Sequence, residues 1–183
     1  MNRQDCIALM AGAGLFFCGV LNAHSVEGTG QLISEADASI AIAASAVEEA
    51  RAAIENGKSL IAMIPADSEL SDEVKQMLVA AAENWSMAVD ALAGAKESAA
   101  KIQGASSLEL AQDYKLLATV NAGVALSGAK VVQAGLLFIE AAAGNKTESL
   151  DIIRMAMQDA LAAASQVEFN YERVKTKMYP VEV

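Results

Sequence analysis

Apolar residues recur along most of this chain at alternating intervals of three and four positions. The spacing runs through a first segment that ends near Gly57, returns in a second that ends at Gly104, and returns again after Gly144. Such a sustained seven-residue repeat predicts long helices that pack with a shallow left-handed crossing, as in coiled coils and four-helix bundles. The predicted seam positions are Ile33, Ala36, Ile40, Ala43, Val47, Ala50 and Ile54; Val74, Leu78, Ala81, Trp85, Ala88, Leu92, Ala95, Ala99 and Ile102; and Leu150, Ile153, Met157, Ala160, Ala164, Val167, Tyr171 and Val174.

The segment before the last repeat is apolar around most of its circumference. Between residues 116 and 143 its only charged residues are Lys130 and Glu140. A helix of this kind is surrounded either by protein or by lipid. We expect a central helix packed by its neighbours, because polar residues such as Asn121 and Gln133 would be costly in lipid. The alternative is a membrane-inserting or self-associating surface, and the side chains that would form such an interaction surface are Val124, Val131, Leu137 and Phe138.

Turn signals divide the chain into four helices, expected at about 30–56, 72–103, 107–143 and 148–175. A capping box formed by Ser106 and Glu109 marks the start of the third helix, and Gly144 with Asn145 marks its end. Short connections favour antiparallel neighbours. The sequence therefore predicts an all-α fold, an antiparallel up-down-up-down four-helix bundle of long Ala-rich heptad helices over 26–176, followed by a C-terminal tail at 177–183.

The first 25 residues have the layout of a secretory signal peptide. Arg3 lies in a short charged region, an uncharged apolar stretch covers 7–21, and a small-x-small site allows cleavage after Ser25 or, alternatively, after Ala23. The apolar stretch is shorter than the roughly 20 residues that a membrane-spanning helix needs. A retained anchor and lipidation at Cys18 are the competing interpretations. We therefore expect an exported protein.

Composition agrees with long helices and narrows the compartment. The chain is 54% hydrophobic but 4% aromatic, and 39 of its 183 residues are alanine. A β-sandwich or barrel would need more β-branched and aromatic residues. Both cysteines, Cys6 and Cys18, lie in the signal segment, so the mature chain would have no disulfide. For an exported protein of this size, that favours a bacterial, periplasmic or extracellular location.

Few residues offer catalytic or metal-binding chemistry. The only histidine, His24, lies at the cleavage site, and a mature chain without histidine or cysteine builds neither a histidine-based acid–base system nor a thiolate metal site. We therefore expect no enzyme activity, no catalytic residues, no metal and no cofactor. The net charge of −10 argues against nucleic acid and anionic lipid as partners. Trp85 is expected to anchor the core, with a cavity for a small apolar ligand beside it as the weaker alternative.

These features favour a non-enzymatic exported protein with a structural or protein-interaction role in the cell envelope. It would act through its helix surfaces, with self-association as one mode of interaction. Two other functions stay open: a bundle that binds or senses a small apolar ligand near Trp85, and a membrane-active protein that uses the apolar third helix. Unrelated proteins share alanine-rich helices, so the fold alone names no function.

Overall fold

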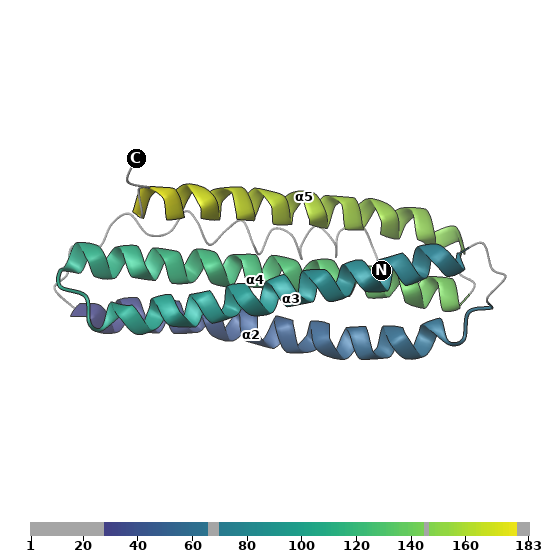
Figure 1. The fold of residues 1–183 in the computed structure, drawn as a ribbon, viewed down its shortest axis with the longest axis horizontal. Coiled ribbons are helices and arrows are strands. Elements are labelled where there is room, and N and C mark those ends of the chain that lie inside the picture. Colours follow the sequence, from purple (N-terminus) through teal and green to yellow (C-terminus); the bar gives the residue numbers. More distant parts are fainter. Residues whose placement is uncertain (1–27, 66–69, 145–146, 179–183) are drawn as a thin grey trace.

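A computed structural model describes residues 28–65, 70–144 and 147–178, and the regular structure within these ranges is helical. Four long helices lie lengthwise beside one another (Figure 1): α2 (Gly28–Ile61), α3 (Ser71–Ile102), α4 (Leu108–Ala143) and α5 (Thr147–Met178). The expectation of an all-α chain with four packed helices is confirmed. The expected signal peptide at 1–25 lies outside the described residues, as does the end of the expected tail.

The central helix is α4, which packs against α2, α3 and α5. Helices α2 and α3 also pack on each other, whereas α5 packs mainly on α4. The largest completely buried side chains include Phe138, Ile139 and Val132, all on α4. Burial of one large apolar side chain contributes about 1.5–3 kcal/mol. A helix that is apolar on most sides is therefore most stable when several neighbours cover it.

The predicted seams of α2 and α3 face the interior. Every one of their seam positions is buried or half-buried, and alanines such as Ala36 and Ala95 are completely covered. Small side chains allow the helices to come close together. The approach is tight at Gly128 of α4, where an added Cβ would lie 3.1 Å from Cβ of Ala88 and 3.2 Å from the carbonyl oxygen of Asn84.

Helix α2 continues through Gly57, where the pattern predicted its end, and stops at Ile61. Gly57 is buried within the helix. An added Cβ at this position would lie 3.2 Å from Cδ1 of Leu136 and 3.3 Å from Cδ1 of Leu78. The glycine therefore makes room for two leucines of neighbouring helices instead of ending its own.

Two other helix ends also differ from expectation. The cap of α4 is Ser107 and not Ser106, since Oγ of Ser107 accepts a hydrogen bond from the backbone N–H of Leu110 at 3.1 Å. The chemistry is that of an ordinary N-cap, displaced by one residue. Helix α5 extends to Met178, so residues 177 and 178 are helical and do not belong to a tail.

Polar side chains join α2 to α4 at the edge of their interface. The best enclosed of them is Lys115, whose side chain is 13% exposed and whose Nζ lies 2.7 Å from Oε2 of Glu35. The hydrogen bond from Lys115 lowers the pKa of Glu35 below its ordinary value of 4.5. Two more contacts follow along both helices: Gln133 Nε2 donates to Glu49 Oε2, and Asn56 Nδ2 donates to Glu140 Oε1, each at 3.2 Å.

Replacing Gly128 with valine should destabilise the fold, because the new side chain would overlap with Ala88 and the backbone of Asn84. Overpacking of this kind costs about 1–3 kcal/mol of the free energy of unfolding, which urea titration followed by circular dichroism measures. Gly30→Val is the matched control, since nothing lies within 4 Å of a Cβ added at Gly30. Equal effects of the two substitutions would contradict the close approach of α3 and α4.

Replacing Glu35 with glutamine should make stability less dependent on pH. Because the pKa of Glu35 is lowered, its carboxylate stabilises the folded state above about pH 4.5, and this contribution is lost as the pH falls through the lowered pKa. The side chain of Glu35 is 38% exposed, so we expect a contribution of no more than about 1 kcal/mol. Urea titrations should show a difference between variant and wild type near pH 7 that shrinks near pH 3. A difference that is the same at both pH values would exclude this role.

Candidate interaction surface

The four side chains predicted to form an interaction surface on α4 are not exposed together. Phe138 is completely buried and Val131 is buried, while Val124 is half-buried. Only Leu137 is exposed, at 37%. Helix α5 explains the burial of Phe138, which clusters with Leu150 and Met157 of α5. In the folded chain, α4 buries most of its apolar surface against its neighbours.

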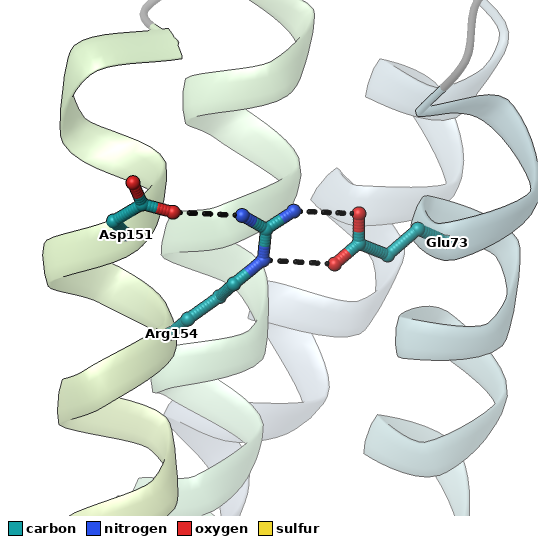
Figure 2. Close-up of polar contacts among 3 residues, drawn as sticks. All are labelled: Glu73, Asp151 and Arg154. Atoms are coloured by element: carbon teal, nitrogen blue, oxygen red, sulfur yellow. Dashed lines mark hydrogen bonds and ion pairs between the residues drawn. The ribbon is translucent and has the colours of Figure 1, made fainter.

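Arg154, near the beginning of α5, bonds to Glu73 of α3 and to Asp151 of its own helix, as Figure 2 shows. Its Nε and Nη2 donate to the two carboxylate oxygens of Glu73 on α3 at 3.0 and 2.8 Å, and Nη1 donates to Oδ1 of Asp151 at 2.9 Å. The guanidinium carbon also lies 5.4 Å from the centroid of the Phe138 ring, within the range of a cation–π interaction. The hydrogen bonds to Glu73 raise the pKa of Arg154 above its ordinary value. One side chain thus joins α5 to both α3 and α4.

Helix α5 presents large apolar side chains on its outer side. Ile152 is 69% exposed, Met155 63% and Phe169 59%. Met155 and Met157 are two positions apart, about 200° around a helix, and Met157 is buried against α4. The exposed side chains therefore lie on the face of α5 that points away from the rest of the chain.

The inner face of α5 is covered unevenly along its length. Near the start of the helix, Leu150 and Met157 are buried, and Arg154 holds this part to α3. Further along, Val167 and Tyr171 are only half-buried. Helix α5 is therefore fixed most firmly at its beginning, and the described side chains of its outer face, such as Met155, Ala162 and Phe169, are accessible.

Trp85 lies on α3, between α2 and α4. Its Nε1 donates a hydrogen bond to the carbonyl oxygen of Val47 on α2 at 3.2 Å, and its ring packs against the cluster that contains Val47, Ala88 and Val132. A narrow gap between side chains, among the described residues, does not include Trp85, and it is lined by Ala53, Ile54, Leu78, Ala81, Val132, Leu136 and Ile139. In these contacts Trp85 is a core residue that bridges two helices.

Two findings on the described residues bear on metal binding and membrane insertion. Within 28–65, 70–144 and 147–178, no group of three or more His, Cys, Asp or Glu side chains is placed to hold a metal ion. Helix α4 is long and apolar enough to cross a membrane by length and composition alone, but 44% of its apolar window is buried inside the protein. The core helix of a folded protein has the same composition, so this is weak support for membrane insertion.

Comparison of the chain with protein families, with curated proteins and with solved structures finds no match. The function must therefore be inferred from the surface of the protein itself. The outer face of α5 was not predicted from the sequence, although the sequence contains a signal for it. Met155, Ala162 and Phe169 recur at intervals of seven, but the stronger apolar repeat of the inner seam runs through the same helix.

Replacing Arg154 with lysine should loosen the first turns of α5. Lysine keeps the charge but cannot donate two parallel hydrogen bonds to the Glu73 carboxylate. Hydrogen–deuterium exchange should become several-fold faster at the backbone amides of residues 150–157 and stay unchanged around Trp85. Arg51→Lys is the control, because Arg51 makes only a long, exposed contact with Glu48 at 4.0 Å. Unchanged exchange in α5 would show that Arg154 does not hold it.

Proposed function

We propose that this chain is an exported, non-enzymatic protein of the bacterial cell envelope that acts by protein–protein contact, including contact with its own copies. The observation that carries the proposal is the outer face of α5, where Ile152, Met155 and Phe169 are each more than half exposed. Exposed apolar side chains that gather on one element are typical of interaction sites. The net charge of −10 supports solubility outside the contact.

We also propose that the helices form an antiparallel up-down-up-down bundle. The order of the contacts supports this topology. Along the α3–α4 and α4–α5 interfaces, later positions on one helix meet earlier positions on the other, whereas the contacts between α2 and α4 advance in the same direction on both helices. The contacts are Gly94 with Asn121 and Ala88 with Gly128; Gly123 with Val167 and Phe138 with Arg154; and Glu49 with Gln133 and Asn56 with Glu140.

The pattern of residues 1–25 supports export. Cleavage after Ser25 or after Ala23 would leave all of α2 in the mature chain, because α2 begins at Gly28. The predicted bundle would therefore pass into the envelope complete. A protein that acts by contact in the cell envelope needs a stable surface and no catalytic group. The residue types of the mature chain agree with this.

Expression in a Gram-negative host should yield a periplasmic or secreted chain shortened to begin at residue 24 or 26, as mass spectrometry of the purified protein would show. Leu15→Arg should block export, because a charge interrupts the apolar stretch on which a signal peptide depends. Leu137→Arg, a similar change on the exposed side of α4, should not. A full-length wild-type chain confined to the cytoplasm would refute the proposed export.

A further inference from the structure

We propose that a second copy of this chain docks on the outer stripe of α5, which consists of Ile152, Met155, Ala162 and Phe169. The two α5 helices would pack antiparallel about a twofold axis that passes close to Ala162. The inference rests on the self-association in the proposed function and deepens it, because it names the surface, the partner and the direction of packing.

The spacing of the outer stripe fits a helix pair. Met155, Ala162 and Phe169 are separated by seven residues each, the repeat that keeps side chains along one seam of two supercoiled helices. All three are exposed. These three side chains point away from the seam that packs on α4. Helix α5 could therefore pack on α4 and on a second helix at the same time.

The order of side chains within the stripe is suited to antiparallel self-pairing. Met155 and Phe169 lie at equal distances along the helix on either side of Ala162. In an antiparallel pair centred on Ala162, Met155 of each copy would therefore lie opposite Phe169 of the other. Thioether–aromatic contacts are favourable, and the small side chain at the centre allows the two backbones to approach. This twofold interface is self-complementary, as a closed dimer requires.

The distribution of charge favours the same partner. Residues 147–178 contain five acidic and four basic residues, so α5 carries one of the ten net negative charges of the chain, as α4 does and fewer than α2 or α3, and repels a second copy only weakly. Its acidic residues predominate in the first half and its basic ones in the second. Antiparallel pairing brings unlike halves together, whereas parallel pairing would bring like halves together. The charged residues are Glu148, Asp151, Arg154, Asp159, Glu168, Glu172, Arg173, Lys175 and Lys177.

Exposed apolar side chains on α4 form no comparable stripe. Leu108, at the first position of α4, is 55% exposed but lies eight residues before Leu116, outside its seven-residue spacing. Leu116 and Leu137 are 21 residues apart, about 31 Å along a helix. Gly123 and Lys130 occupy the positions between them at intervals of seven. One helix pair buries less surface than the roughly 1,600 Å² of a standard interface, so the α5 dimer should be weak and its population should rise with concentration.

The first test is sedimentation equilibrium of the exported chain over a range of concentrations. Wild type should form dimers, and Met155→Glu should raise the dissociation constant more than about tenfold, because each dimer would enclose two carboxylates in an apolar seam. Met87→Glu is the matched control, since Met87 is 55% exposed on α3, and it should dimerise like wild type. Met155→Leu should also dimerise, and circular dichroism should show equal helix content in all four proteins.

The second test is cross-linking in the full chain with Cys6 and Cys18 replaced by serine, so that each introduced cysteine stands alone. Ala162→Cys should form a disulfide-linked dimer on mild oxidation. A mixture of Met155→Cys and Phe169→Cys chains should form the mixed dimer. Met155→Cys alone should not, because the two copies of position 155 would lie about 21 Å apart in an antiparallel pair, too far for a disulfide.

The outcomes separate this inference from the proposed function. Dimers that survive Met155→Glu, or that cross-link through Met155→Cys alone, would overturn the antiparallel α5 interface and leave self-association standing. A wild-type chain that is exported but stays monomeric at every concentration would overturn the interface and self-association together. Loss of dimers in Met155→Glu alone, with cross-linking through Ala162→Cys, would support the interface.

Discussion

The fold depends on covering one helix that is apolar on most of its sides. Helix α4 achieves this within a single chain by packing against α2, α3 and α5. Close packing is possible because its neighbours present small side chains: the backbone near Ala88 lies so close to Gly128 that even a methyl group would be crowded. Protein interiors lose stability when atoms are added or removed at such points. The abundance of alanine is therefore the condition under which α4 can be enclosed.

Helix α5 has a different position from the other three. It covers Phe138 and is fastened by the fork of hydrogen bonds between Arg154 and Glu73, but α2 and α3 do not enclose it. As a result, α5 has one apolar face that packs within the chain and a second that lies at the surface. The inner face stabilises the fold, and the outer face is available for contact with another molecule.

The apolar repeat was sufficient to predict the helices and their inward faces, because the position of a residue such as Ala36 or Val74 in the repeat predicts that its side chain is buried. It failed where tertiary packing determines the role of a residue. Gly57 is a residue type that is typical of helix ends, but in this fold Leu78 and Leu136 occupy the space beside it. No local pattern contains that information, because the two leucines lie on other helices.

The candidate surface was harder to predict for a related reason. Val124, Val131, Leu137 and Phe138 are equally apolar in sequence, and only the packing of the neighbouring helices, α5 among them, decides that Phe138 is covered and Leu137 is exposed. The outer stripe of α5 is weakly encoded, because Ala162 at its centre resembles the many alanines that serve packing. A second, interrupted repeat on a helix is hard to recognise beside a continuous one.

The position of Trp85 has a consequence for how this protein can be observed. It is the only tryptophan of the chain, and the cluster around it is built from α2, α3 and α4. Helix α5 contributes to a separate cluster through Leu150 and Met157. Tryptophan fluorescence therefore reports on the packing of α2, α3 and α4 and is nearly insensitive to the position of α5. A single sharp fluorescence transition would describe the unfolding of that three-helix core, while detachment of α5 at lower denaturant would pass unseen, so agreement with a second probe is needed before two-state unfolding is assumed.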